Sequence, residues 1–386
     1  MNILKPVFYD EFSCVGSDCL LTCCGGWCIT VDEKTLKKYR KMGGEIARFA
    51  RHGVCYNEDK NSNVVKLQKK GCCPMLNEEQ LCRVVLEKGP AALCHTCRIY
   101  PRVSVHSFDT VEQYLSMGCP RVVQLLFQME NKLTFVFEED ASMQTQELPV
   151  FNKKIYVNMK VRDSIVDFIQ KSSLPLWFRK FYGAYVIQKM LPDIRAEDFD
   201  AVVQKTEHFL DASFCQEFYE RIKDNATDRQ QQFQVLREII LKIDVGICKL
   251  LFWDVHGYSG QVLDLLNLNK DCSFEQWNNA RETWEKERNL FHQENMLVYN
   301  WVLRAFVPQK EHRLLKNYIA SVLINLLVNH FMILYSIHYP PTEQMETVIT
   351  ALMTRVVQSG NIVDILQQEM ENGVLSPAFL LRLCNI

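Results

Sequence analysis

The chain has 386 residues, of which 48% are hydrophobic and 23% are charged, and its net charge is −2 at pH 7. This near-neutral balance excludes a strongly electropositive nucleic-acid-binding protein. No run of about 18 apolar residues predicts a membrane-spanning helix, and the opening segment, MNILKPVFYDEF, is too acidic and too poor in apolar residues for a signal peptide. We therefore expect a cytoplasmic protein with no membrane segment and no nucleic-acid partner.

Residues 1–148 have mixed patterns that predict short elements. Residues 1–30 are punctuated by glycine and predict an irregular loop region. Asp32 is the predicted N-cap of a helix over 33–50, in which Gly43-Gly44 is a weak point. The other predicted elements of this part are a strand over 64–68, helices over 78–87, 91–99 and 120–129, and strands over 103–114 and 133–140.

After Leu148 the pattern changes to apolar residues at helical spacing. The predicted helices lie over 153–171, 175–190, 197–223, 229–250, 258–267, 274–306, 311–337, 342–358, 361–371 and 376–384. The absence of sustained heptads and of a fixed-period repeat excludes a coiled coil and a regular solenoid. We therefore predict a mainly α protein, in which a small cysteine-rich α+β module that holds a metal cluster (1–148) precedes an all-helical domain (149–386).

Cysteine is the unusual residue of this chain: there are 16, and twelve of them precede residue 120. A disulfide framework is typical of small secreted domains, which this large chain without an export signal does not resemble. Burial as a small apolar side chain is the simplest interpretation of the other four, which are Cys215, Cys248, Cys272 and Cys384. The dense early group instead favours thiolates that bind a metal ion or cluster in a reducing compartment.

The cysteine spacing favours an iron–sulfur cluster and leaves zinc as an alternative. Zinc sites use paired Cys-x2-Cys knuckles, whereas the adjacent Cys23 and Cys24 cannot easily both reach one tetrahedral ion. Cys73-Pro74 and Cys119-Pro120 are pairs of the kind found at ferredoxin-type ligands. The Cys-x3-Cys-x2-Cys motif of radical enzymes is missing. We therefore expect the cluster to have a structural or positioning role rather than a redox role.

Five segments of the chain form an ordered set of motifs, four with cysteines and one far downstream. They are FSCVGSDCLLTCCGGW (12–27), CPMLNEEQLC (73–82), LCHTCRIYPR (93–102), GCPRVVQLL (118–126) and ENMLVYNWVLRAFVP (294–308). In order and separation they resemble the bacterial flagellin lysine-N-methylase family. The cysteine segments alone also resemble a wider group of small cysteine-cluster proteins, so the downstream segment is what favours a methylase.

The resemblance implies a cytoplasmic enzyme that uses S-adenosylmethionine to methylate the ε-amines of surface lysines on flagellin, and it implies a [4Fe-4S] cluster. The cysteines that match the family pattern, and that are the implied metal ligands, are Cys14, Cys19, Cys23, Cys24, Cys73, Cys82, Cys97 and Cys119. Cys94 stands where the family commonly has serine and is interpreted as a bystander. Eight cysteines exceed the four that one cubane needs, so either two centres exist or four cysteines pack around one. The alternative function is a non-catalytic iron- or zinc-binding protein that docks a protein partner.

Methyl transfer to lysine also needs groups that bind the donor and a neutral amine, because free lysine has a pKa of about 10.4. A continuous helix over 274–306 would place His292, Asn295 and Tyr299 on one face, flanked by Glu294. Tyr299, Asn295 and Glu294 are therefore the predicted catalytic residues. The alternative is that Asn295 and Tyr299 hydrogen-bond buried backbone groups.

Three further residues are predicted to bind the cofactor. Asn300 also flanks the polar strip of the downstream helix, and Tyr100 and Arg102 belong to the YPR segment beside the cysteines. The alternative for Tyr100 and Arg102 is that they pack against the cluster loop. The sequence leaves open whether the helical domain or the junction of the two domains binds the methyl donor.

Overall fold

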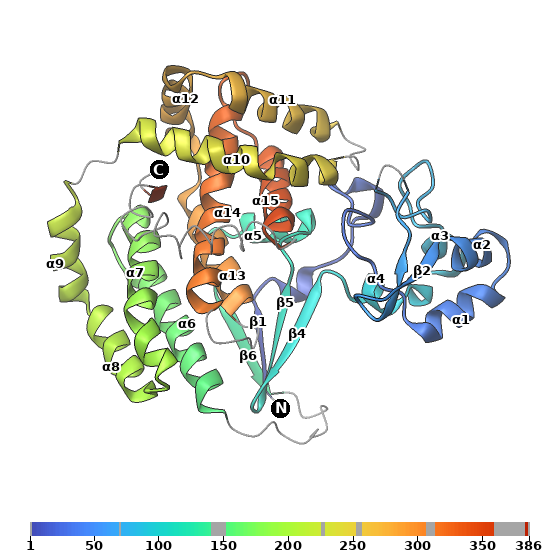
Figure 1. Ribbon diagram of the computed structural model, residues 1–386, viewed down its shortest axis with the longest axis horizontal. Helices are drawn as coiled ribbons and strands as arrows, with labels where there is room; N and C mark the ends of the chain where they lie inside the picture. The colour runs from blue at the N-terminus through green and yellow to red at the C-terminus, as the bar shows by residue number, and fades with distance from the viewer. Residues whose placement is uncertain are drawn as a thin grey trace.

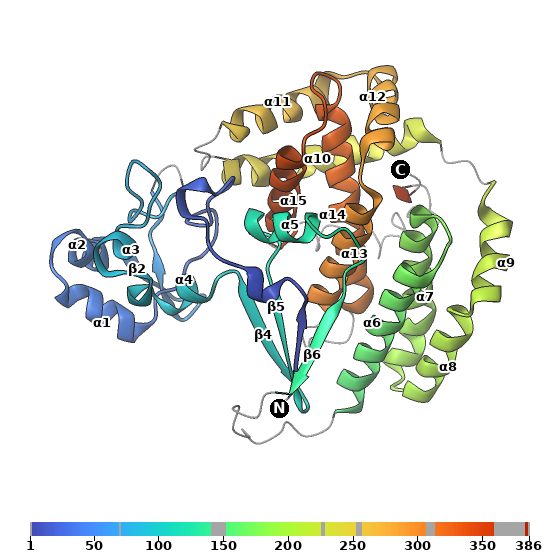
Figure 2. The same cartoon turned by 180° about the vertical axis from the view of Figure 1, so that it is seen from behind.

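The computed structural model describes residues 2–68, 71–139, 152–224, 228–251, 257–305, 313–358 and 383–384. Figures 1 and 2 show it from two opposite sides: a small module of short elements lies beside a larger helical body, with a sheet between them. The predicted helix over 361–371, most of the one over 376–384 and the predicted boundary at residue 148 lie outside the described residues.

A four-stranded sheet has the strand order β4-β5-β1-β6. It pairs the first residues of the chain with strands that lie after residue 101. Its strands are β1 (Asn2–Pro6), β4 (Arg102–Ser107), β5 (Thr110–Leu115) and β6 (Phe135–Glu139). The strands predicted over 103–114 and 133–140 are confirmed, the first as the β4–β5 hairpin. The predicted loop over 1–30 is wrong at β1. This strand pairs in parallel with β5 and antiparallel with β6, and such long-range pairing leaves no local signal in the sequence.

The small module lies between β1 and β4 in the sequence and buries a core of its own. Its elements are α1 (Glu33–Lys41), α2 (Gly44–His52), β2 (Val54–Asn57), β3 (Ser62–Val65), α3 (Arg83–Lys88) and α4 (His95–Ile99). The helix predicted over 33–50 divides into α1 and α2 because Gly43 and Gly44 both take positive φ angles. Asp32 is the N-cap, as predicted, since its side chain accepts a 2.9 Å hydrogen bond from the Thr35 N–H.

Every described element from residue 152 to residue 358 is a helix, which confirms the helical character predicted for this half. With α5 from the first half, these helices are α5 (Pro120–Phe127), α6 (Lys153–Lys171), α7 (Leu176–Arg195), α8 (Phe199–Phe209), α9 (Ala212–Ile222), α10 (Arg229–Leu251), α11 (Tyr258–Asp271), α12 (Phe274–Glu287), α13 (Leu290–Ala305), α14 (Arg313–Tyr335) and α15 (Glu343–Gln358).

Two predicted helices divide because an internal polar residue caps a new helix. In the helix predicted over 197–223, Asp211 accepts hydrogen bonds from the N–H groups at the start of α9. In the one predicted over 274–306, the Asn289 side chain accepts a 2.9 Å bond from the Phe291 N–H and so begins α13. The predicted polar strip lies within α13, so this division does not disrupt it.

The large core spans the helical body and the sheet. Phe8, Tyr114 and Phe127 of the N-terminal region are buried in the same cluster as the helices after residue 152. Leu314–Tyr335 of α14 is long and apolar enough to cross a membrane, but its apolar window is wholly buried inside the protein. It packs against α7, α12, α13 and α15 as a central core helix. The sheet and α5 therefore belong to the helical body, and the module between β1 and β4 is mounted on it.

Candidate functional site

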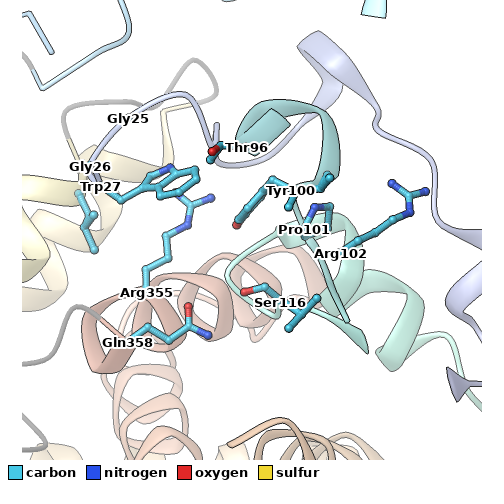
Figure 3. A pocket seen from close by; sticks show the side chains of 13 residues that line it. Gly25, Gly26, Trp27, Thr96, Tyr100, Pro101, Arg102, Ser116, Arg355 and Gln358 are labelled. Atoms are coloured by element: carbon cyan, nitrogen blue, oxygen red, sulfur yellow. The ribbon is translucent and has the colours of Figure 1, made fainter. Parts of the chain in front are cut away.

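A cavity of about 450 Å³ lies where the small module meets the helical body. Its walls come from the module loop at 25–27, from the segment that joins α4 to β4, and from the C-terminal ends of α10 and α15. Figure 3 shows Trp27 and Arg355 close together, with Tyr100 facing them. This volume is within the range of small-molecule sites, so we call this hollow the junction cavity and treat it as the candidate site.

Two aromatic rings form one wall of the junction cavity. The ring centroids of Trp27 and Tyr100 are 5.5 Å apart, and their planes are tilted by 32°. The Trp27 Nε1–H donates a 2.8 Å hydrogen bond to the Cys23 carbonyl, which orients the indole. At Gly26, with φ of 75°, an added Cβ would lie 2.5 Å from Leu250 Cδ2, so glycine allows the loop to approach α10. The wall is suited to a flat or cationic group.

Arg355 of α15 connects the helical body to the module. Its Nε donates to the Gly118 carbonyl at 2.7 Å, its Nη1 to the Thr22 carbonyl at 2.9 Å and its Nη2 to the Leu21 carbonyl at 3.0 Å. These carbonyls are neutral, and the described residues that line the cavity include no carboxylate. The charge of Arg355 is therefore available to an anionic group of a ligand.

Tyr100 and Arg102 both line the junction cavity. Burial raises the pKa of the Tyr100 hydroxyl, so this group remains protonated at neutral pH. Arg102 lies over the Phe12 ring at 5.1 Å, and its Nη2 donates to the Phe12 carbonyl at 3.4 Å. Figure 3 shows it directed away from Trp27 and Tyr100. Its part in cofactor binding remains a prediction.

One group of cysteines, the junction thiols, lies beside this cavity and comprises Cys14, Cys19, Cys23 and Cys119. Cys119 is close enough to Cys19 and Cys23 for their charges to interact, and so is Cys14 to Cys19. Tyr100 interacts with three of these thiols. Burial raises the pKa of Cys119 to about 12. Burial also raises the pKa of the Cys19 thiol, and interaction with Cys24 together with burial raises the pKa of the Cys23 thiol. In the absence of a cation, Cys19, Cys23 and Cys119 are therefore neutral at pH 7.

A second group, the module thiols, comprises Cys24, Cys73, Cys82, Cys94 and Cys97. Cys97 interacts with Cys94, Cys24 and Cys73, and Cys82 interacts with Cys94. The Cys73 N–H also donates a 2.9 Å hydrogen bond to the Cys24 carbonyl. The structure thus places Cys94, the expected bystander, in contact with predicted ligands. Its signal in the sequence was the Cys-x2-Cys spacing to Cys97.

Four of the eight predicted ligands are junction thiols and four are module thiols, and the two groups adjoin, because Cys23 interacts with Cys24 and with Cys82. The adjacent Cys23 and Cys24, whose thiols interact directly, belong to different groups. All 16 cysteines are free thiols, and each group of four suits thiolate ligation of a metal or cluster by its donor chemistry. Within the described ranges, no three His, Cys, Asp or Glu side chains are positioned to hold one metal ion.

The predicted catalytic residues of α13 lie in the large core and do not line the junction cavity. The Tyr299 hydroxyl accepts a 2.8 Å bond from the Leu115 N–H and donates a 2.9 Å bond to the Leu115 carbonyl. Asn295 accepts from the Leu133 N–H at 2.8 Å and donates to the Asn131 carbonyl at 3.0 Å. These contacts match the alternative in which both residues satisfy buried backbone groups, and a catalytic role for them remains a prediction.

Glu294 and Asn300 of the same helix have different surroundings. Glu294 forms ion pairs with Arg179 at 2.6 Å and with Lys132 at 3.4 Å. The Asn300 side chain is fully buried, and both of its polar atoms lack a hydrogen-bond partner among the described residues. The role of Asn300 in cofactor binding remains a prediction.

Sequence reasoning missed Trp27 and Arg355 as site residues. Trp27 stands within the first cysteine motif, next to Gly25-Gly26, and this position is the signal that could have identified it. Arg355 left no such signal, because the carbonyls that it binds in the module loop are more than 300 residues away in the sequence.

The protein is thus a mainly helical one that carries a small cysteine-rich module, and a ligand-sized cavity lies where the module meets the helical body. A model of the FliB lysine N-methylase C-terminal domain matches residues 162–383, more than half of the chain. The chain belongs to the FliB lysine N-methylase family. No solved structure matches it.

Three proteins from Salmonella are similar to part of the chain. The flagellar biosynthetic protein FliU of Salmonella muenchen is 38% identical over 126 residues, which cover 32% of this chain and 75% of FliU. The lysine-N-methylases of Salmonella typhimurium and Salmonella choleraesuis are each 38% identical over 126 residues, which cover 32% of this chain and 31% of theirs. The match therefore spans about a third of the length of these two lysine-N-methylases.

Proposed function

We propose that this protein is a cytoplasmic, S-adenosylmethionine-dependent methyltransferase that acts on the ε-amines of surface lysines of flagellin. Its membership of the lysine N-methylase family is the observation that carries the proposal. The name of one relative, flagellar biosynthetic protein FliU, supports a flagellar substrate. The junction cavity is the proposed site, because it combines a ligand-sized volume with aromatic and cationic walls.

The chemistry of the cavity walls matches the parts of the donor. The carboxylate of S-adenosylmethionine would pair with Arg355, which has no carboxylate partner among the residues lining the cavity. The sulfonium or the adenine would lie against the Trp27 and Tyr100 rings, since aromatic faces attract cations and stack with flat rings. Three backbone carbonyls hold the guanidinium of Arg355 in place, so little ordering is needed when the donor binds.

The proposed reaction is an in-line displacement. The lone pair of a neutral lysine amine forms the new N–C bond, the C–S electron pair stays on sulfur, and the proton of the methylated amine passes to solvent. A cavity with a partly buried cation, Arg355, and no carboxylate among its described lining residues disfavours an ammonium ion, so it favours the neutral, reactive amine. The protonated Tyr100 hydroxyl is available as a hydrogen-bonding group rather than as a base.

We also propose that the two groups of thiols hold thiolate-bound metal, either iron–sulfur clusters or zinc. The four junction thiols would form one ligand set, and Cys24, Cys73, Cys82 and Cys97 would form the other, with Cys94 beside them. When bound, such a centre supplies a rigid cross-link between distant segments. The Trp27 loop directly follows Cys23 and Cys24, one thiol from each group, so a bound centre would also fix this loop against α10 and α15.

Donor binding to purified, anaerobically prepared protein tests the proposed site. The Trp27→Ala variant should weaken binding of S-adenosylmethionine about tenfold, because it removes the aromatic wall. The matched control is Tyr56→Ala, which removes an exposed aromatic side chain elsewhere in the module and should leave the affinity unchanged. Calorimetry that detects no binding to the unaltered protein, or equal binding to both variants, would contradict the proposed site.

A further inference from the structure

A second cavity, of about 730 Å³, lies wholly within the helical body. Its lining residues come from the N-terminal turn of α7, from the connection between α12 and α13 and from the start of α10. Figure 1 labels these helices. The lining residues on which the argument depends are Trp177, Arg179, Lys180, Arg229, Arg288 and Phe291. The proposed methyl transfer does not use this cavity, and its lining residues differ from those of the junction cavity.

The cavity carries an excess of positive charge. Four cationic side chains line it against two carboxylates, and both carboxylates already have partners. Glu294 pairs with Arg179 at 2.6 Å, and Glu285 pairs with Arg281, which is not a lining residue. The Nε groups of Arg179 and Arg288 are buried without a hydrogen-bond partner among the described residues. Such groups are costly to bury unless a ligand or water satisfies them.

Lys180 is the most buried of these cations, with 1% of its surface exposed. The described residues offer its amine no hydrogen bond and no ion pair. Burial, and to a lesser extent the charges of Arg288 and Arg179, lower the pKa of Lys180 to about 7, although the Cys384 thiol acts in the opposite sense. A lysine this deep is stable as a cation only when an anion lies next to it.

The start of α7 adds backbone donors to the same wall. This 20-residue helix begins after Pro175, and no side chain caps its first turn. The N–H groups of its first residues, among them Leu176 and Trp177, therefore have no acceptor within the helix. Both residues line the cavity, and the helix dipole favours negative charge at this end.

We propose that this cavity binds the phosphate group of a small organic molecule, held by Lys180, Arg288, Arg229 and the first turn of α7. A doubly charged anion suits the number of unpaired cations better than a single carboxylate does. The apolar side chains at the mouth, Leu290 and Phe291, are partly exposed, and with Trp177 they offer a surface for the organic part of the ligand. The site goes beyond the proposed methyl transfer and does not depend on it.

Calorimetric titration of the full chain with inorganic phosphate and with phenyl phosphate tests the site. Both should bind, and phenyl phosphate should bind more tightly, because its ring meets the apolar mouth. Lys180→Met and Arg229→Gln should each weaken binding roughly tenfold or more, since each removes a charge-assisted contact. Arg229 is exposed, so its variant keeps the test valid if Lys180→Met fails to fold. The matched control is Lys189→Met, which removes an exposed charge from the same helix.

The proposal would be overturned by a lack of binding of both probes, by affinities that neither Lys180→Met nor Arg229→Gln changes, or by tighter binding of inorganic phosphate than of phenyl phosphate. Titration of the Trp27→Ala variant separates the two sites. The Trp27→Ala variant should bind phosphate with unchanged affinity. A failure of the methyltransferase proposal therefore leaves the phosphate site intact, and a failure of the phosphate site leaves the methyltransferase proposal intact.

Discussion

At the scale of single residues, the polar side chains of α13 act on the backbone of distant elements. Tyr299 bonds both backbone groups of Leu115, which lies beyond the last pair between β1 and β5, Leu4–Glu112. Asn295 bonds the backbone of the segment between α5 and β6 in the same manner. Tyr299 and Asn295 therefore attach the sheet and the segment before β6 to the helical body, and this attachment explains why these two polar side chains are buried.

The Tyr299→Phe variant tests this structural role. It keeps the ring but leaves the buried Leu115 N–H and carbonyl without their partner, so the free energy of unfolding should fall by about 2–3 kcal/mol. Urea denaturation measures this fall, and methyl transfer per folded molecule should stay within about twofold. The control is Tyr335→Phe, because the described contacts include no hydrogen bond to the Tyr335 hydroxyl. Full stability with lost transfer would instead support the predicted catalytic role of Tyr299.

At the scale of elements, α7 and α14 approach each other through a glycine. A Cβ at Gly183 of α7 would lie 2.3 Å from the Tyr318 hydroxyl oxygen of α14. That hydroxyl donates a 3.2 Å hydrogen bond to the Arg179 carbonyl, which holds the ring in place. The two helices therefore cannot separate to accept a methyl group without loss of this contact.

Alanine substitution at two glycines should have opposite effects. Gly183→Ala should lower the free energy of unfolding by about 2 kcal/mol, because it overpacks the contact with Tyr318. Gly246→Ala in α10 should raise it by about 0.5–1 kcal/mol, since nothing lies within 4 Å of the added Cβ and alanine favours a helix. Thermal or chemical unfolding measures both. Equal stabilisation by the two variants would show that α7 and α14 are not packed this closely.

The sequence predicted elements well where their signals are local. The prediction of 153–171 agrees with α6, since Asn152 caps its start and the apolar spacing continues to its end. Prediction from the sequence failed for β1, because this strand pairs with partners more than 100 residues away. The candidate site follows the same rule: Tyr100 was predicted from a cysteine motif, whereas Arg355 enters the site through contacts that only the fold creates.

At the scale of the whole molecule, two cores of different size meet at the junction cavity. The module core lies around residues 29–97, and the large core unites the sheet with the helices. Arg355 and Leu250 of the large body contact the module loop over residues 21–26. A movement of the module would therefore change the junction cavity directly, so the proposed donor site depends on the integrity of both cores.

The intact mass of flagellin co-expressed with this protein tests the central claim most directly. We expect flagellin to gain whole methyl groups on lysines when the unaltered protein is present. The gain should fall strongly with the Trp27→Ala variant and persist with the Tyr56→Ala control. An unchanged flagellin mass, with the unaltered protein folded and able to bind S-adenosylmethionine, would contradict the assignment of flagellin as the substrate.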